Sequence, residues 1–256
     1  MKTIDLNCDM GESFGAYTIG ADEAVMPSIT SANVACGFHG GDPSVMRRTV
    51  RLARDHEVAV GAHPGFPDLV GFGRRDMRVA PQEVEDLVLY QIGALAGIAQ
   101  GEGLRLAHVK PHGALYNMAV KDRSLADAIA RAVASFDRSL IFFALPNSDL
   151  ARAGHSAGLQ VALEGFADRA YEPDGSLTPR SRAGAVICDQ ETVVRRAVRM
   201  ATEGVLVATD GSELAMHVDT ICTHGDTPGA QSLTRALRAG LERAGVKVAA
   251  VAGIPR

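Results

Sequence analysis

Tryptophan is absent from this chain of 256 residues, and aromatic side chains together make up only 5% of it. Basic residues form no block, and 26 lysines and arginines against 30 acidic residues leave a net charge of −4. Because a nucleic-acid surface needs a basic patch, often with interleaved aromatics, we expect no nucleic-acid partner. The longest apolar stretches, 140–145 and 246–254, are shorter than the roughly 20 residues that cross a bilayer, so we expect no membrane partner either.

Cysteine is also scarce. Its four positions, Cys8, Cys36, Cys188 and Cys222, lie far apart and form no CxxC pair. This spacing excludes a zinc ribbon and a CxxC redox motif. The N-terminal segment has no hydrophobic region followed by a cleavage site. These features predict a cytoplasmic protein with reduced thiols, in which Cys36 and Cys222 are small core residues.

Several signature motifs are missing. The chain has neither GxxxxGK[ST] nor GxGxxG after a strand, which excludes a P-loop and a dinucleotide fingerprint. It has no GxSxG elbow, and no cysteine has a recognisable Cys-His context, so a covalent Ser or Cys mechanism is disfavoured. It also lacks HExxH, so any metal site has to be assembled from distant strands.

Strand-like and helix-like segments alternate along the chain. Short, nearly continuous apolar runs predict strands that are buried on both faces, as in a parallel sheet covered by helices. These runs are Thr3–Asp9, Ser31–Cys36, Val58–His63, Arg105–Lys110, Leu140–Leu145, Leu159–Glu164, Val205–Thr209 and His217–Thr223.

Helix starts are marked by prolines in Asp42-Pro43, Pro81 and Thr227-Pro228. The repeated alternation predicts an α/β fold, a distorted (β/α) barrel formed by residues 1–256 as a single domain. An open doubly wound sheet is the alternative. Asp210-Gly211 is typical of a hairpin turn between the runs at 205–209 and 217–223, and predicts one antiparallel element that interrupts the barrel.

Half of the eight histidines follow a strand-like run and precede a glycine by one or two residues. They are His39, His63, His112 and His224. Because parallel strands open their carboxyl ends on one face, where ligands bind, we expect these imidazoles to converge there. Two roles are open for them. They can bind a divalent metal together with Asp9 or Asp226, or they can act with the carboxylates as general acid and base without metal.

The first strand carries a ladder of polar side chains. Alternation places Asp5, Asn7 and Asp9 on one face, which is the lumen in a barrel. Polar groups in a core are costly unless they are partnered, which favours a functional ladder. A turn or helix-cap role for Asp9 and Glu12 is the alternative. Lys110 ends a buried strand, so it needs a carboxylate or a bound anion as partner.

Two connections are longer than a compact barrel requires, and both contain arginines. The first, Gly65–Arg78, contains Arg74, Arg75 and Arg78, and the second, Gly165–Arg182, contains Arg169, Arg180 and Arg182. Loops of this length are commonly functional or mobile. Their guanidinium groups either hold a carboxylate or phosphate, or are solvated surface charges.

Six segments together resemble the LamB/YcsF family. They are DLNCDMGE (5–12), NVACGFHGGDP (33–43), GAHPGFPD (61–68), VKPHGALY (109–116), EGFADRAY (164–171) and CTHGD (222–226). The resemblance extends from residue 3 to residue 252, with no departure at the motif positions.

This resemblance implies a distorted seven-stranded (β/α) barrel, similar to glycoside hydrolases and polysaccharide deacetylases. It also implies an ATP-dependent 5-oxoprolinase, a cyclic amide hydrolase that opens the lactam of 5-oxo-L-proline to give L-glutamate. In that family the activity requires two partner subunits, B and C. ATP, together with Mg²⁺, is then the expected co-substrate. The resemblance leaves undecided whether the chain forms a homo-oligomer.

Roles for individual side chains follow as hypotheses. Catalytic roles are assigned to Asp9, Glu12, His39, His63 and Asp226, of which Asp9, His39 and His63 are also the candidates for a metal. Contacts with the substrate or its phosphate are assigned to Asn7, Lys110, His112, Arg169 and His224. Two other functions remain as alternatives: a stand-alone divalent-metal-dependent hydrolase of the deacetylase type, and a non-catalytic subunit that only binds substrate or partners.

Overall fold

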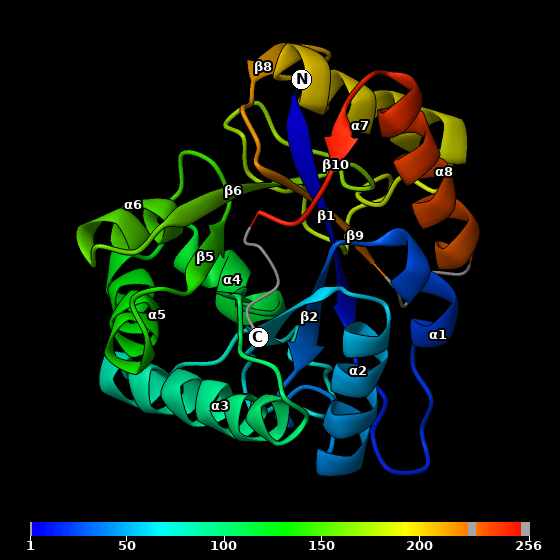
Figure 1. The fold of residues 1–256 in the computed structure, drawn as a ribbon. Helices are drawn as coiled ribbons and strands as arrows, with labels where there is room; N and C mark the ends of the chain where they lie inside the picture. The colour runs from blue at the N-terminus through cyan, green and yellow to red at the C-terminus, as the bar shows by residue number, and fades with distance from the viewer. Residues whose placement is uncertain (1, 225–228, 252–256) are drawn as a thin grey trace.

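The computed structural model describes residues 2–224 and 229–251, in which strands and helices alternate (Figure 1). The strands are β1 (Thr3–Met10), β2 (Ser31–Ala35), β3 (Ala59–His63), β4 (His108–Val109), β5 (Ile141–Ala144), β6 (Val161–Phe166), β7 (Val205–Val207), β8 (Glu213–Ala215), β9 (Thr220–His224) and β10 (Lys247–Val248). The helices are α1 (Asp22–Val25), the 3₁₀ turn η1 (Met26–Ser28), α2 (Pro43–Asp55), α3 (Pro81–Gly101), α4 (Gly113–Ala119), α5 (Arg123–Phe136), α6 (Asp149–Ser156), α7 (Gln190–Glu203) and α8 (Ala230–Arg243).

Parallel strands close into a barrel within the described residues. Its seven strands follow the order β1-β2-β3-β4-β5-β6-β9, and β9 pairs back with β1. Strand β10 adds to β1 outside this ring, at Thr3 and Ile4. The predicted distorted seven-stranded (β/α) barrel is therefore confirmed, and the open doubly wound sheet is wrong. None of the helices in the described ranges is both long and apolar enough to cross a membrane.

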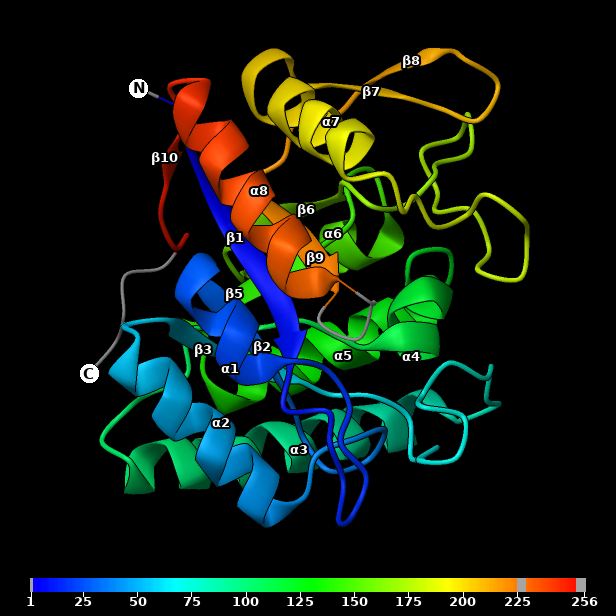
Figure 2. The same ribbon diagram turned by 90° about the vertical axis from the view of Figure 1, so that its right-hand side faces the viewer.

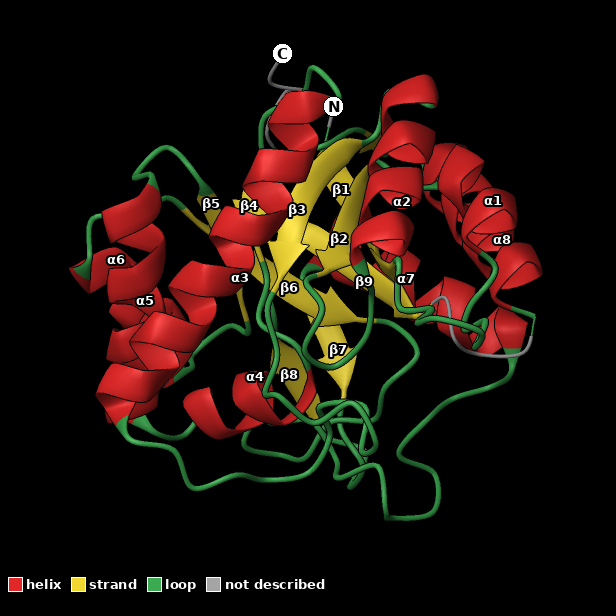
Figure 3. Ribbon diagram, turned by 90° about the horizontal axis from the view of Figure 1, so that it is seen from below, coloured by secondary structure: helices red, strands yellow, loops and turns green. Residues whose placement is uncertain are grey.

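Helices cover the outer face of the barrel, as Figure 3 shows from the side of the loops at the strands' carboxyl ends. Figure 2 shows α8 between α7 and α1. Outward side chains of the strands, such as Leu6, Val34 and Val60, belong to one large apolar cluster with helix residues such as Val88 and Leu237. The inward face is largely polar on β1, so the alternation predicted for this strand is confirmed.

The helix starts follow the expected signals where the structure describes them. The Asp42 carboxylate caps α2 by accepting hydrogen bonds from the backbone N–H groups of Ser44 and Val45, at 2.8 and 2.9 Å. Pro81 is the first residue of α3. The start expected at Thr227-Pro228 lies outside the described residues, and the helix that follows, α8, begins at Ala230.

The region after α7 differs from the prediction. The antiparallel element predicted for the run 205–209 is present, but β7 pairs with β8 and not with the run 217–223. Val207 of β7 is half-exposed, so only one face of β7 is covered. The Asp210-Gly211 turn is confirmed, with the Ser212 N–H donating to Asp210 Oδ1 at 2.9 Å. The partner expected for the hairpin, 217–223, instead gives the parallel barrel strand β9.

One row across the barrel depends on a glycine. The register aligns Asp9 with Asn33, Asn33 with Gly61, and Gly61 with His108. Because Gly61 has no side chain, the His108 ring lies over it and reaches Asn33, whose Oδ1 is 2.7 Å from His108 Nε2. A Cβ atom at position 61 would overlap that ring.

We therefore expect Gly61→Ala to lower the free energy of unfolding by about 1–3 kcal/mol or more, since overpacking a filled interior forces neighbours to move. Gly93, in the middle of α3, is the matched control because a Cβ there meets nothing within 4 Å. Gly93→Ala should raise stability by roughly 0.5–1 kcal/mol. Urea denaturation of both variants checks this, and equal effects would contradict the role given to Gly61.

Candidate functional site

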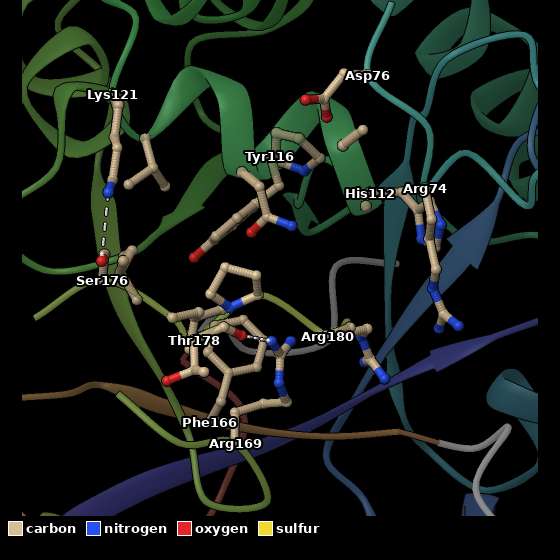
Figure 4. A pocket seen from close by; sticks show the side chains of 18 of the residues that line it. Arg74, Asp76, His112, Tyr116, Lys121, Phe166, Arg169, Ser176, Thr178 and Arg180 are labelled. Carbon is tan, nitrogen blue, oxygen red and sulfur yellow. Dashed lines mark hydrogen bonds between the residues drawn. The ribbon is translucent and has the colours of Figure 1, made fainter. Parts of the chain in front are cut away.

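Polar side chains gather at the carboxyl ends of the barrel strands, around a cavity of about 570 Å³. Asp9 from β1, His63 from β3 and Lys110 after β4 form its floor, and His112 lies beside them. Figure 4 shows the cavity walls, with Tyr116 and His112 on one side and Phe166, Arg169 and Thr178 on the other. The convergence predicted for the strand-end histidines is confirmed for His63 and His112, and His39 stacks on the second of these.

The Lys110 ammonium is the centre of the floor. Its Nζ lies 2.9 Å from Asp9 Oδ1 and 2.9 Å from Glu164 Oε1, and 3.0 Å from Cys222 Sγ. Burial opposes the charge of Lys110, but Asp9, Cys222 and Glu164 together outweigh it and hold the pKa of Lys110 well above its usual value. The sequence required an anionic partner for this lysine, and the structure supplies two.

A chain of hydrogen bonds holds Asp9 in place. His108 Nε2 contacts Asn33 Oδ1, and the Asn33 Nδ2 group donates to Asp9 Oδ1 at 2.8 Å and to Asn7 Oδ1 at 2.7 Å. Asn7 Nδ2 in turn donates to Thr220 Oγ1 at 2.7 Å. Both amides thus have their donors and acceptors assigned by their partners, and Asp9 sits at the end of a rigid network.

The polar ladder divides into two parts. Asp5 lies at the far end from the cavity, where its Oδ1 accepts hydrogen bonds of 2.7 Å from the hydroxyls of Thr30 and Ser31. Burial raises the pKa of Asp5, which has a structural place in the barrel. Asn7 is fully buried between Asn33, Thr220 and Lys110 and does not line the cavity. Asp9 alone of the three faces the cavity.

Four buried side chains form a second cluster next to this floor: Glu12, His39, His63 and His112. One potential ligand atom from each lies within 4.8 Å of the others. His63 Nε2 and His112 Nδ1 are 2.9 Å apart, and Glu12 Oε1 lies 3.6 Å from His112 Nδ1 and 3.5 Å from His39 Nε2. Of the metal candidates expected from the sequence, His39 and His63 belong to this cluster. Asp9 lies next to it, with its Oδ2 3.4 Å from His63 Nε2 and its Oδ1 paired with Lys110.

Two of the imidazoles in this cluster are stacked in surroundings that disfavour their charged form. The rings of His39 and His112 are parallel, with centroids 3.6 Å apart. Burial lowers the pKa of each well below its usual value, and the neighbouring imidazoles add to the effect. Phe72, from the long loop after β3, closes over the stack and accepts a hydrogen bond from His112 Nε2 on its backbone oxygen.

Cationic side chains from the two long loops meet at the cavity mouth. Arg74 comes from the first loop and Arg169 and Arg180 from the second (Figure 4). Arg169 is held by the backbone oxygens of Thr178 and Ala185, at 2.7 and 3.2 Å. Burial, together with the charges of Arg180 and Arg74, lowers its pKa to about 10. Like charges placed this close favour an anion between them.

The other loop arginines have structural or surface roles. Arg75 binds the buried Asp68 carboxylate, with its Nε 3.0 Å from Oδ2, and Arg182 pairs with Glu172 at 2.7 Å. Arg78 does not line the cavity. In each loop, therefore, some arginines line the cavity and others do not.

The structure brings together most of the predicted site. Asp9, Glu12, His39, His63, Lys110 and His112 form the floor and the adjoining cluster, with Arg169 at the mouth. His224 ends β9 beside Asp9 in the register, but its side chain and the whole of Asp226 lie outside the described residues.

Sequence reasoning missed Asn33, His108 and Glu164 as parts of the network. Each lies in an expected strand and faces inward, so the alternation that singled out Asp9 was present for these residues too. Cys222 was predicted to be a small core residue, but besides being buried it touches Lys110.

The pH dependence of stability should reveal the neutral state of His108. Burial, aided by Lys110, lowers the pKa of His108 to about 3. At pH values between this folded-state pKa and the unfolded-state pKa near 6.5, the unfolded chain carries one more proton on His108 than the folded chain does. The free energy of unfolding that His108 contributes therefore falls by about 1.4 kcal/mol for each unit by which the pH decreases. His108→Gln should flatten the profile by that slope in urea unfolding between about pH 6 and 4. The exposed His155→Gln is the control, and parallel profiles for wild type and H108Q would refute the assignment.

Comparison with known proteins identifies the family. A model of the LamB/YcsF family matches residues 4–256. The chain is 59% identical over 250 residues to a Symbiobacterium thermophilum protein named as the A subunit of 5-oxoprolinase, with 98% of this chain and 96% of that protein covered. It is 53% identical over 251 residues to the Bacillus subtilis protein of the same name, with 98% of each covered.

Solved structures agree with this relationship. The crystal structure of a lactam utilization protein from Thermus thermophilus superposes with a TM-score of 0.92 at 53% identity, covering 97% of this chain and 99% of that one. A putative cellobiose-phosphate cleavage protein from Enterococcus faecalis shares the fold, with a TM-score of 0.56 at 14% identity and 97% of each chain covered. With its barrel, its motifs and its full-length relatives, the chain belongs to the LamB/YcsF family.

Proposed function

We propose that this chain is the A subunit of an ATP-dependent 5-oxoprolinase, which opens the lactam of 5-oxo-L-proline to L-glutamate together with B and C subunits in the cytoplasm. The observation that carries the proposal is the near full-length identity of 53–59% to proteins named as the A subunit of 5-oxoprolinase. The cavity supports it, because a buried floor of acid–base side chains and the guanidinium groups of three arginines line the same cavity. The names of these relatives, which describe one subunit, also point to an assembly.

The proposed chemistry explains the need for ATP. A lactam carbonyl is a poor electrophile, so its oxygen first attacks the γ-phosphoryl group of ATP and ADP leaves. Water then adds to the activated carbon, the C–N bond breaks and the ring nitrogen takes a proton, which leaves an acyl phosphate. A second water hydrolyses this acyl phosphate to L-glutamate and phosphate. Such a sequence needs a base for water, an acid for the ring nitrogen and cations for the phosphoryl group.

The floor residues suit the proton transfers. Asp9 Oδ1 is engaged by Lys110 and Asn33, while its carboxylate lines the cavity and its Oδ2 lies 3.4 Å from His63 Nε2. We assign Asp9 as the base for water. Lys110 offsets its charge and holds its orientation, so the carboxylate does not have to reorganise during the reaction.

The mouth residues suit the anionic groups. Arg74, Arg169 and Arg180 can hold the substrate carboxylate and the transferred phosphoryl group by paired N–H donors. This group of arginines fits a phosphorylated substrate. It does so whether Mg²⁺–ATP binds to this chain, whose sequence has no P-loop, or to a partner subunit. Arg180 is exposed, so it can meet a ligand that enters from solvent.

Reconstitution tests the reaction. Glutamate release from 5-oxo-L-proline should occur with this chain, both partner subunits and ATP, and should be absent when the chain or ATP is left out. Asp9→Asn in the full mixture should lower kcat by about 10²–10⁴, the usual contribution of a general base. Glutamate formation without ATP, or a loss of less than about tenfold in D9N, would overturn the proposal.

Two arginines in one loop test the anion contacts. Arg180 lines the cavity, whereas Arg182, two residues later, is exposed and pairs with Glu172. Arg180→Ala should lower kcat/KM for 5-oxo-L-proline by roughly 10–100-fold, since hydrogen bonds to charged groups contribute about 1.5–3 kcal/mol. Arg182→Ala should change it less than about twofold, because exposed ion pairs contribute little. Equal losses in the two variants would contradict this arrangement of the mouth.

A further inference from the structure

The imidazoles of His63 and His112 face each other in the site, but each ring has its hydrogen-bonded N–H on the nitrogen that points away from the other ring. His63 Nδ1 lies 2.7 Å from the backbone oxygen of Lys110, and His112 Nε2 lies 2.8 Å from that of Phe72. A carbonyl oxygen only accepts, so in the neutral rings these two nitrogens carry the hydrogens. The remaining nitrogens, His63 Nε2 and His112 Nδ1, then face each other at 2.9 Å with lone pairs only.

Two lone pairs at this distance repel unless a cation lies against both. A proton would satisfy them only by turning one of two buried rings into an imidazolium. A metal ion satisfies both nitrogens and leaves both rings neutral, which is the form in which histidine binds metals.

Further ligand atoms surround the same point. Glu12 Oε1 lies 3.6 Å from His112 Nδ1, and His39 Nε2 lies 3.5 Å from Glu12 Oε1. Bonds of 2.0–2.1 Å in a tetrahedral site place neighbouring ligand atoms about 3.3 Å apart, close to these separations. Glu12, His63 and His112 therefore already lie close together around one point that an ion could occupy.

The surroundings of the rings match a metal site as well. Metal-binding histidines almost always donate their second N–H to a carboxylate, a carbonyl or water, and His63 and His112 both donate to carbonyls. His39 is parallel to His112, so an ion in the plane of one ring lies outside the plane of the other. His39 has to turn to bind, and among the described residues neither of its ring nitrogens makes a hydrogen bond that opposes this.

We propose that Glu12, His63 and His112 bind one divalent transition-metal ion of the Zn²⁺ type at the cavity floor, with His39 as a fourth ligand after rotation of its ring. Imidazole nitrogens with one carboxylate suit Zn²⁺ better than Mg²⁺ or Ca²⁺, which prefer oxygen. The inference depends on the cluster and not on the lactam reaction. If the proposed function holds, such an ion would activate the attacking water or polarise the substrate.

Metal binding by the isolated chain tests this without any activity assay. The purified chain is stripped with a chelator, incubated with zinc chloride, gel-filtered and analysed for bound zinc. One ion per chain is expected. Its affinity should fall more than about tenfold in His63→Gln, His112→Gln and Glu12→Gln, and should be unchanged in the exposed His155→Gln. Zinc should also raise the Tm of wild type, by roughly 5–10 °C at a hundredfold excess over Kd.

X-ray absorption of the zinc-loaded wild type guards against variants that fail to fold. It should show nitrogen and oxygen ligands at roughly 2.0–2.2 Å, with an imidazole signature and no sulfur. A sulfur ligand would place the ion elsewhere, since the exposed Cys188 lies outside the cluster, and would overturn the proposal. Failure of the wild type to retain zinc would overturn it too. A chain that binds zinc as described but gives no glutamate with its partners would refute the proposed function alone.

Discussion

The buried ammonium of Lys110 and the two carboxylates that flank it link strands that are not neighbours in the barrel. Lys110 follows β4, whereas Asp9 is on β1 and Glu164 is on β6. Removing such a charge from water is costly, and only close partners with complementary charge offset that cost. Loss of Lys110 would leave two carboxylates in the interior without the counter-charge that they share. The triad of Lys110, Asp9 and Glu164 therefore couples the stability of the closed barrel to the geometry of the cavity floor.

The site divides its parts between two kinds of structure. The floor is built from inward-facing strand residues, which are held by the hydrogen-bond network from His108 through Asn33 to Asp9. The mouth is built from loops, whose cations Arg74 and Arg180 are exposed. A rigid floor preserves the alignment that proton transfer requires, whereas exposed cations on loops can adjust to an incoming anion.

Much of the barrel and the floor of its site could be predicted because alternation and strand ends are local signals. The strand-end rule found His63 and His112, and the ladder found Asp9. The same rules could not show that His108 reaches across a neighbouring strand to Asn33, since that contact depends on register. Nor could they show that β7 pairs with β8 and not with the run 217–223, because both runs are apolar and tertiary packing decides which of them enters the barrel. Only the fold likewise showed that Arg180 lines the cavity and Arg182 does not.

The contact between Gly61 and the ring of His108 also has an evolutionary consequence. The imidazole of His108 occupies the space that any larger residue at position 61 would need. Neither position can then change freely while the other stays as it is. Family members that carry a larger residue at the position of Gly61 should have replaced the histidine as well, and should orient the counterpart of Asn33 by another donor. Positions 61 and 108 are thus expected to covary, because their residues share one space between two neighbouring strands.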